Sequence, residues 1–332
     1  MFKVIRALSI LTVCSLFFSS VFAQNTRDKI EIVKPKTYAA PVMERSAALQ
    51  TLLSTAVTEV MAAYKIKPED IAATLIDLRD PNKPQIAEIN GEARFYTASV
   101  VKMFYMAALE RQLEDGKVMM TKELDRGLRD MIVDSSNEAT QYILDVLTDS
   151  SGGSELSQQE FEKWQFKRNR VNRFFSSLGY TNININQKTF CEDAYGIERQ
   201  SRNYPTDAAN RNKLTTNATA RLLAEIALRR FVNESRSNAM LALMSRDWEN
   251  PSNDPDNQAV GFTGKALIDG KMTGAKLWSK AGWAIRSRHD AAYIETSDGL
   301  KFVIVVFTEN HKNEREPIPS VVAKVIEGLR KK

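Results

Sequence analysis

Apolar and polar residues alternate in two parts of the chain, one near its beginning and one near its end. The stretch IAATLIDLRD at residues 71–80 has the pattern and composition of a strand. PNKP then marks a turn and QIAEIN continues the pattern, so the two stretches predict a β-hairpin. AKLWSKAGWA, HDAAYIETS and LKFVIVVFT predict three more strands, with Asp298-Gly299 as a hairpin turn.

Helical periodicity flanks and separates these strands. We predict a first helix over residues 41–64, beginning at a proline, and a mostly helical region over 99–249. This region contains a longer polar helix at 157–179 and an irregular, Asn-rich loop at 180–213. A last helix begins near Pro317 with apolar residues at the spacing of one helix face: Ile318, Val321, Val322, Val325, Ile326 and Leu329.

This order of elements predicts an α+β fold. Both ends of the chain build one antiparallel five-stranded sheet, flanked by the N- and C-terminal helices, and an all-helical lobe is inserted between them. We expect a polar linker at residues 24–40 and one folded domain at 41–332. Within it, the α/β lobe takes 41–95 and 265–332, and the helical lobe takes 96–264. The site is expected in a cleft between the lobes.

The first 23 residues have the composition of a secretory signal peptide. Lys3 and Arg6 precede the apolar stretch ALSILTVCSLFFSSVF, and Val21 and Ala23 offer small side chains at the cleavage positions. An uncleaved anchor is one alternative. A lipoprotein signal through Cys14 is another, although Val13 is a poor residue before a lipidated cysteine. We therefore expect a secreted, periplasmic protein with no stable membrane span after cleavage.

Composition and charge narrow the class of protein further. The 332 residues are 43% hydrophobic and 26% charged, typical of a globular chain. The formal net charge of +5 becomes +3 without Lys3 and Arg6, and the basic residues lie in mixed segments, so we predict no nucleic-acid partner. Cys191, the one cysteine outside the leader, is expected to be a small buried residue. No residue spacing predicts a metal site, and we expect no cofactor.

A candidate nucleophile lies in the stretch RFYTASVVKMFYMAALE, which begins at Arg94. Ser99 and Lys102 are three residues apart, so a helix puts both side chains on one face. A serine hydroxyl needs a nearby base to act as a nucleophile, and burial lowers the pKa of a lysine. The Ser-x-x-Lys spacing alone occurs by chance about once in a chain of this length. The alternative is therefore an ordinary helix start with an ion-paired lysine.

Two further short motifs carry polar groups suited to the same chemistry. Residues 135–137 read Ser-Ser-Asn at the junction of two predicted helices, where a serine can relay a proton and an asparagine can hold an amide. Residues 280–282 read Lys-Ala-Gly on a predicted strand. There the lysine supplies positive charge, the glycine lets a substrate approach the backbone, and the next N–H can stabilise an oxyanion.

In this order, TASVVK, SSN and KAG resemble the motifs S-x-x-K, S-D-N and K-T-G of the class A β-lactamase and penicillin-binding-protein group of serine hydrolases. MIVDSSNEAT, LTTNATARLLAEI and RHDAAYIETSDGLKFVIVVFT are also similar to that family, so the resemblance extends over about residues 45–330. It implies a two-lobed β-lactamase-like catalytic domain that forms an acyl-enzyme with a β-lactam or a peptidoglycan-derived peptide. We expect a monomer.

The resemblance implies specific catalytic roles. Ser99 would be the acylated nucleophile, Lys102 its proton partner and Ser135 the proton relay to the leaving nitrogen. The E-x-x-L-N loop that supplies the family's deacylating glutamate is missing. Glu198 is the first candidate for that role and Glu192 the second. If neither reaches Ser99, the acyl-enzyme would be long-lived, as in a penicillin-binding protein.

The resemblance also implies a set of substrate-binding residues: Asn137, Lys280, Ala281, Gly282, Trp283 and Arg286. The backbone N–H groups of Ser99 and Trp283 would form the oxyanion hole. Ala281 stands where the family has Thr or Ser, and the lost hydrogen bond to a substrate carboxylate would cost about 1.5–3 kcal/mol. Arg286 or Arg288 would compensate through a bidentate contact with that carboxylate.

Other functions remain open at this point. A D,D-peptidase or transpeptidase acting on cell-wall peptides is the first, and a catalytically weak module that binds β-lactams or muropeptides is the second. A glutaminase-like amidase is a more distant alternative. A Ser–His–Asp site would have to use His289 and Asp290, whose position on a predicted strand edge favours a structural role. Ser135 follows Ser99 by 36 positions, fewer than in the lactamases that the chain resembles, and this difference implies a more open cleft.

Overall fold

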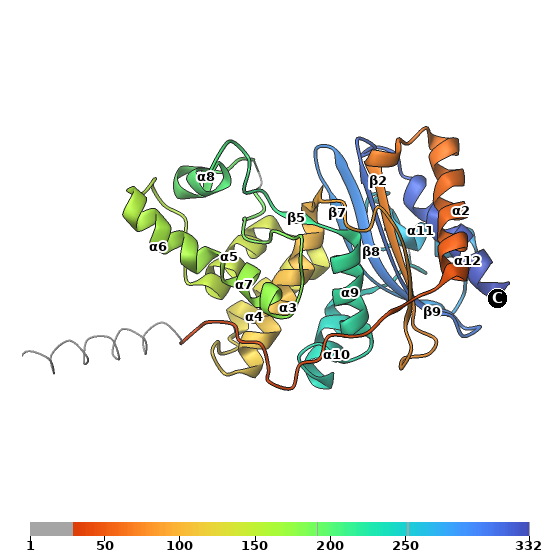
Figure 1. The fold of residues 1–332 in the computed structure, drawn as a ribbon, viewed down its shortest axis with the longest axis horizontal. Helices are drawn as coiled ribbons and strands as arrows, with labels where there is room; N and C mark the ends of the chain where they lie inside the picture. Colours follow the sequence, from red (N-terminus) through yellow and green to blue (C-terminus); the bar gives the residue numbers. More distant parts are fainter. Residues whose placement is uncertain (1–28, 191, 251, 332) are drawn as a thin grey trace, which may run out of the picture.

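The computed structural model describes residues 29–190, 192–250 and 252–331. The leader expected at 1–23 and Cys191 lie outside these ranges. The described chain forms two lobes, one built on a β-sheet and one built from helices (Figure 1). The α+β prediction is therefore confirmed, and the sheet lobe is built from segments near both ends of the described chain.

The sheet has seven strands in the order β1-β3-β2-β9-β8-β7-β6. The strands are β1 (Glu44–Arg45), β2 (Ile71–Asp77), β3 (Gln85–Ile89), β6 (Ser245–Arg246), β7 (Lys276–Trp283), β8 (Ser287–Glu295) and β9 (Lys301–Glu309). The prediction of five antiparallel strands was wrong in number and direction, because β1 and β6 are added at the edges and β1 runs parallel to β3. Each of these two strands has only two residues, too few to show a period of two in the sequence.

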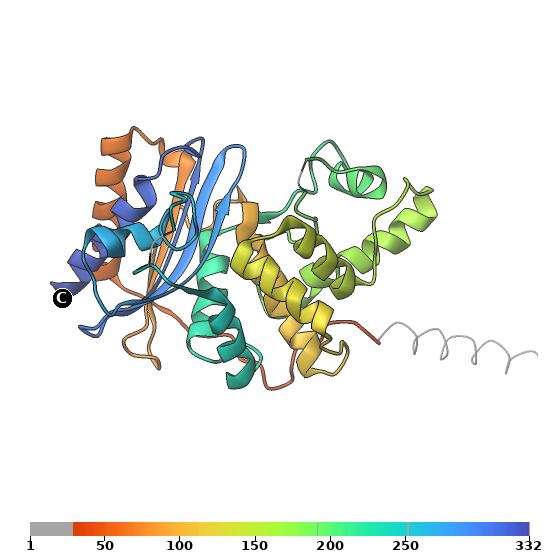
Figure 2. The same ribbon diagram turned by 180° about the vertical axis from the view of Figure 1, so that it is seen from behind.

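Helices cover both faces of the sheet (Figures 1 and 2). One face carries α2 (Ala47–Tyr64), α11 (Thr263–Asp269) and α12 (Pro317–Arg330), and the other packs on α9 (Thr216–Ala227) and the helical lobe. The central strand β9 supplies both cores by turns: Phe302, Ile304 and Val306 to one, Val303, Val305 and Phe307 to the other. This alternation follows from the opposite orientation of successive side chains in a strand.

The helical lobe surrounds one buried helix, α3 (Val101–Glu114). Nearly all its residues are buried, including Lys102 and every residue from 103 to 109. The other helices of the insertion are α4 (Lys122–Arg129), α5 (Asn137–Thr148), α6 (Gln158–Arg168), α7 (Arg170–Ser177), α8 (Gly196–Arg202) and α10 (Glu234–Met244). The short strands β4 (Phe95–Tyr96) and β5 (Lys213–Leu214) pair beside them. A lysine in this helix is therefore enclosed by the core.

Several predicted helix bounds differ from the observed ones. The helix α2 begins at Ala47 and not at residue 41, because the Ser46 hydroxyl accepts the Leu49 N–H and caps it there. The helix expected over 157–179 is split into α6 and α7 at Asn169, and the loop expected at 180–213 contains α8. Among the described residues, no helix combines the length and apolar character needed to cross a bilayer.

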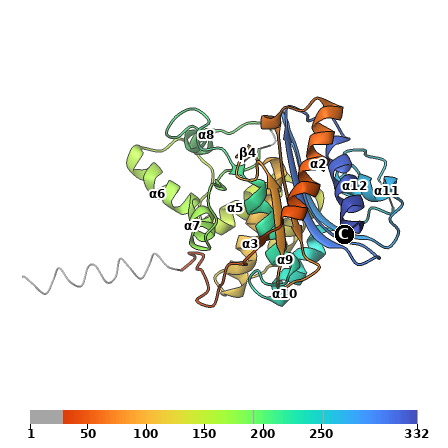
Figure 3. The same cartoon turned by 45° about the vertical axis from the view of Figure 1, so that its right-hand side comes forward.

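Residues 29–43 lie along the helical lobe before the chain enters the sheet at β1 (Figure 3). Glu31 forms ion pairs with Arg170 and Arg173. The side chain of Ile32 is buried, and the Tyr38 hydroxyl donates to Glu225. The described part of the segment expected as a polar linker thus makes specific contacts with the lobe that it crosses.

Candidate active site

Ser99 lies in a short 3₁₀ turn, η2 (Ala98–Val100), which joins β4 to α3. The preceding Ala98 has a left-handed backbone (φ 42°), uncommon for a residue other than glycine. Ser99 is partly exposed, whereas Ala98 and Val100 on either side are buried. A Cβ atom on Gly282 would lie 3.0 Å from the Thr97 carbonyl oxygen and 3.1 Å from the Ser99 nitrogen. Glycine there allows β7 to lie directly against this turn.

Lys102 extends from the first turn of α3 toward the loop between α4 and α5. Its Nζ atom donates to the Ser135 carbonyl at 2.5 Å, to Ser135 Oγ at 3.2 Å and to Asn137 Oδ1 at 2.9 Å. The side chain is fully buried. The Ser-x-x-Lys and Ser-Ser-Asn motifs are therefore in direct contact.

The backbone around Ser135 explains this contact. A π-helical turn, η3 (Asp130–Asp134), ends at Ser135, which is left-handed (φ 59°). The Ser136 side chain then caps α5 by accepting the Ala139 N–H at 3.0 Å. Together the tight exit from one helix and the capped start of the next direct Ser135 and Asn137 toward Lys102.

Lys280 reaches the same hydroxyl from strand β7. Its Nζ atom donates to Ser135 Oγ at 3.0 Å, to the Ala281 carbonyl at 2.9 Å and to Gln258 Oε1. Burial is the main reason that the pKa of Lys280 is well below its usual value, and the nearby charges of Lys102 and Arg246 lower it further. The Ser135 hydroxyl thus lies between two lysine nitrogens, an arrangement suited to moving a proton.

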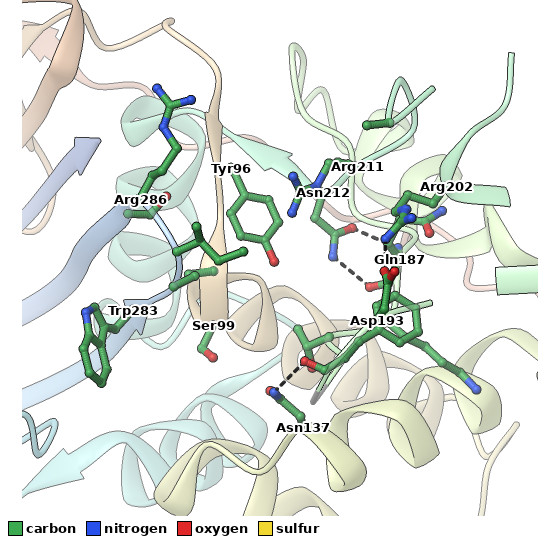
Figure 4. Close-up of a pocket in the computed structure, with 18 of the residues that line it drawn as sticks. Tyr96, Ser99, Asn137, Gln187, Asp193, Arg202, Arg211, Asn212, Trp283 and Arg286 are labelled. Carbon is green, nitrogen blue, oxygen red and sulfur yellow. Dashed lines mark hydrogen bonds and ion pairs between the residues drawn. The ribbon is translucent and has the colours of Figure 1, made fainter. Parts of the chain in front are cut away.

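Two cavities open beside Ser99. The first, the Tyr96 cavity, has a volume of about 670 Å³, and Tyr96, Ser99 and Asn137 point into it (Figure 4). The guanidinium of Arg211 stacks on the Tyr96 ring at 4.3 Å from its centre. The second, the Gln258 cavity, has a volume of about 740 Å³ and lies between Ser99, β7 and the loop that carries Gln258. Ser99 lines both cavities, so a substrate could extend to either side of it.

The residues expected to bind substrate lie around these cavities and differ in burial and in hydrogen-bond partners. The Asn137 amide donates to the Phe190 carbonyl at 3.1 Å. Ala281 is buried, and its N–H donates to Gln258 Oε1 at 3.2 Å. Trp283 is 50% exposed, with its indole N–H bonded to the Lys312 carbonyl. Most of these side chains already have partners within the protein.

The two arginines proposed to replace the missing Thr or Ser lie in different places. Arg286 is exposed at the rim of the Tyr96 cavity and donates to Asn310 at 2.8 Å. Arg288 is buried, and its guanidinium bonds to Asp256 and to the Gly261 carbonyl. Both guanidinium groups already bind groups of the protein, and compensation by either remains a prediction.

The two candidate bases for deacylation are placed very differently. Glu198 is buried, and both its carboxylate oxygens accept from Arg168 at 2.8 Å. Lys188 lies 3.4 Å from the same carboxylate. Glu198 is not among the residues that line either cavity beside Ser99. Glu192 is exposed and lines the Tyr96 cavity. The catalytic role of either glutamate remains a prediction.

His289 is held as a neutral imidazole between two backbone groups. Its Nδ1 atom accepts the Thr308 N–H at 3.1 Å, so Nε2 carries the proton and donates to the Tyr96 carbonyl at 2.8 Å. Burial lowers the pKa of His289 to about 4. Asp290 accepts the Thr263 N–H at 3.0 Å. Because both ring nitrogens are engaged by the backbone, the alternative Ser–His–Asp site has no support in this geometry.

Sequence reasoning missed two residues of the site, Gln258 and Arg246. Gln258 lies in a loop without periodicity, and nothing in the sequence points to it. Arg246 is buried in β6, where its guanidinium donates to the Ser279 and Ile132 carbonyls and burial lowers its pKa to about 10. In the described part of the chain, no group of His, Cys, Asp and Glu side chains is arranged to hold a metal ion.

Comparisons with known proteins agree with this geometry. A sequence profile described as "Beta-lactamase enzyme family" matches residues 52–326. No curated protein matches the chain in a sequence search. Among solved structures, a β-lactamase from Sphaerobacter thermophilus is 19% identical with a TM-score of 0.58, covering 85% of this chain and 96% of its own.

Two further structures have the same fold. A point mutant of PBP-A, described as an acyl-enzyme complex with penicillin-G, is 16% identical with a TM-score of 0.59, and the match covers 88% of this chain and all of that one. A β-lactamase from Chitinophaga pinensis is 16% identical with a TM-score of 0.57, and the match covers 84% and 98%. At these identities the likeness establishes the fold.

Proposed function

The chain belongs to the β-lactamase enzyme family of serine hydrolases, and from that premise we propose that it forms an acyl-enzyme through Ser99. The substrate is a β-lactam or a related amide or ester. The observation that carries the proposal is the Ser135 hydroxyl, which lies 3.2 Å from Lys102 Nζ and 3.0 Å from Lys280 Nζ beside the Ser99 turn. Groups from three distant parts of the chain meet there.

Acylation requires two proton movements. Ser99 Oγ adds to the substrate carbonyl carbon, and its proton passes to Lys102 Nζ. For this step Lys102 is in its amine form, which donates to only two of its three oxygen partners and offers a lone pair. The backbone N–H groups of Ser99 and Trp283 stabilise the oxyanion. When the C–N bond breaks, Ser135 gives its proton to the leaving nitrogen and regains one from Lys102. The product is a Ser99 ester, and Lys102 returns to its amine form. The amine is released from an open-chain amide and stays attached to the acyl group when the substrate is a β-lactam.

A second candidate function, that of a penicillin-binding protein, follows from the state of Glu198. Hydrolysis of the ester needs a base that activates water. Both Glu198 oxygens are bonded to Arg168, which favours a structural role for that carboxylate. We therefore propose slow deacylation and a long-lived acyl-enzyme. In such a protein the natural substrate is a cell-wall peptide, and a β-lactam acts as an inhibitor.

Intact mass spectrometry after mixing with benzylpenicillin tests the proposal. We expect an adduct of one penicillin on the wild type that persists for hours. The variant Ser99→Ala should form no adduct, while its free energy of unfolding changes by only about 1 kcal/mol. Ser297→Ala, a change at an exposed serine in the β8–β9 turn, is the matched control and should label like the wild type. Labelling of Ser99→Ala at the wild-type rate would show that the assignment is wrong.

The same time course separates the two candidate functions. Rapid appearance and loss of the adduct would indicate a β-lactamase, and a persistent adduct indicates the second function. We expect Glu198→Gln to leave the adduct lifetime unchanged. A lifetime at least ten times longer in that variant would instead identify Glu198 as the deacylating base. Secretion, a periplasmic location and a monomeric state also remain proposals, based on the leader and the composition.

A further inference from the structure

Gln258 binds two groups of the Lys-Ala-Gly motif, which the family resemblance places at the substrate. Its Oε1 atom accepts from Lys280 Nζ and from the Ala281 N–H. The other two protons of the Lys280 ammonium go to Ser135 Oγ and the Ala281 carbonyl. A lysine ammonium has three N–H donors, so none remains for a carboxylate.

The orientation of the Gln258 amide is determined by its surroundings. Its Nε2 atom donates to the carbonyls of Val133 at 2.9 Å and Ile132 at 3.4 Å, on the side opposite Lys280. Exchanging the oxygen and nitrogen would place donors against donors on one side and acceptors against acceptors on the other. The amide oxygen therefore faces Lys280, in the position that a substrate acceptor would take.

The loop that carries Gln258 is anchored by ion pairs. Arg288 Nη1 donates to Asp256 at 3.0 Å, and its Nη2 donates to the Gly261 carbonyl at 2.6 Å. Arg315 binds the other Asp256 oxygen at 2.7 Å. The buried Arg288 is thus used to hold the loop in place, and the loop keeps Gln258 against Lys280.

The acidic side chains of the Gln258 cavity also disfavour a substrate carboxylate. Four carboxylates line it: Asp134, Asp247, Asp254 and Asp256. The arginine among its lining residues, Arg246, donates to the carbonyls of Ile132 and Ser279. A carboxylate that entered this cavity would meet these like charges, whereas a neutral amide or an ammonium would be tolerated.

We propose that Gln258 determines specificity by disfavouring a carboxylate next to the scissile bond, so that the enzyme prefers a neutral or cationic substrate group in the Gln258 cavity. A β-lactam with a carboxylate, such as benzylpenicillin, then reacts slowly, because it must first displace the Gln258 oxygen from Lys280. The Gln258 oxygen takes the place of the carboxylate oxygen on β7. Ala281 fits this assignment. The family's Thr or Ser at this position binds a substrate carboxylate through its hydroxyl, and a substrate without that carboxylate does not need this contact. The inference rests on the proposed acylation of Ser99.

A pair of depsipeptide esters tests the inference about Gln258. They are N-phenylacetylglycyl-D-lactate and its D-lactamide counterpart, in which an amide replaces the carboxylate beside the scissile ester. We expect the wild type to react with the lactamide at least as fast as with the lactate. Gln258→Ala and the longer Gln258→Met both free Lys280 and the Ala281 N–H, and should raise the lactate-to-lactamide rate ratio at least about tenfold. Gln158→Ala, on the exposed start of α6, is the control and should keep the wild-type ratio. A wild-type preference for lactate, or an unchanged ratio in both variants, would overturn the inference.

Failure of the proposed function is recognised separately, since then neither ester reacts with any variant. In that case crystals of Ser99→Ala soaked in acetate decide the inference without acylation. We expect no acetate at Lys280 Nζ when Gln258 is present, and bound acetate in the Ser99→Ala/Gln258→Ala protein. Acetate at Lys280 in the presence of Gln258, or its absence from both proteins, would refute the exclusion.

Discussion

In one cluster of buried and half-buried charge, Arg168 and Lys188 meet the carboxylates of Glu198 and Asp145 at 2.7–3.4 Å. In another, Lys102 and Lys280 meet at the hydroxyl of Ser135. The first cluster has two charges of each sign. In the second, the three protons of Lys280 all go to neutral oxygens. The first cluster thus pairs buried charges of opposite sign, whereas the second places two lysines together with only neutral hydrogen-bond partners for Lys280.

This difference separates structural from chemical use of a buried charge. Opposite charges in contact compensate part of each other's desolvation cost, and removing one partner leaves the other uncompensated. A buried lysine beside another cation gives up its proton more easily, which is what proton transfer near neutral pH requires. We therefore expect changes in the first cluster to alter stability and changes in the second to alter acylation.

The largest effect is expected at Lys102. Lys102→Met removes the proposed proton acceptor of Ser99, and the rate constant for acylation by benzylpenicillin should fall about 10²–10⁴-fold. Stopped-flow or quenched mass spectrometry measures this rate. The same substitution at Lys265, which pairs with Asp269 at the surface, should leave it unchanged. Acylation of Lys102→Met at the wild-type rate would contradict the proposed role of Lys102 as the proton acceptor.

Arg168→Met tests whether the first cluster serves stability. It leaves the buried Glu198 carboxylate without its bidentate partner, and the free energy of unfolding should fall by about 3–5 kcal/mol in denaturant titrations. The double variant Arg168→Met/Glu198→Leu should recover much of that loss. Below the unfolding transition, the acylation rate of the folded Arg168→Met protein should stay within about threefold of wild type. A stable Arg168→Met protein with slow acylation would mean that the ion-pair cluster belongs to the active site.

His289 offers an intermediate case, a buried group that remains neutral. Its pKa is about 4 in the folded protein, below the usual 6.5, so the unfolded chain binds a proton first as the pH falls. Stability should therefore decline from pH 6.5 to about 4 by up to about 3 kcal/mol and be fully retained above pH 6.5. His289→Gln keeps a donor for Tyr96 and should remove this part of the decline. Equal pH slopes for both proteins would contradict the assignment of a neutral imidazole.

The smallest effect is expected at Ser136, which departs from the family motif. Its side chain caps α5 through the Ala139 N–H and contacts neither lysine in the described contacts. Aspartate is an equally good cap, so Ser136→Asp should change the unfolding free energy by no more than about 0.5 kcal/mol. The acylation rate should change less than threefold. Thermal unfolding and the penicillin time course measure both.

The sequence alone predicted much of the fold and part of the site. The periods of two and 3.6 residues indicated the five long strands and the helix α12, because burial on one side leaves a repeating pattern. The chemical identity and order of the motifs led to Ser99, Lys102, Ser135, Asn137 and Lys280. Lys102 and Lys280 contact the Ser135 hydroxyl, Asn137 contacts Lys102, and Ser99 lines a cavity together with Ser135 and Asn137. These features depend on neighbouring residues or on short motifs, and can therefore be predicted from the sequence.

Tertiary structure decided the features that depend on distant partners. Edge strands of two residues carry no period, and only pairing with β3 and β7 defines them. Glu198 was a plausible loop carboxylate in the sequence, and its engagement by Arg168 is visible only in the fold. Gln258 belongs to no motif, yet a loop anchored by Arg288 holds its amide oxygen against Lys280. Hydrogen bonds and ion pairs over long sequence separations leave no local signature, because geometry and not spacing selects the partner.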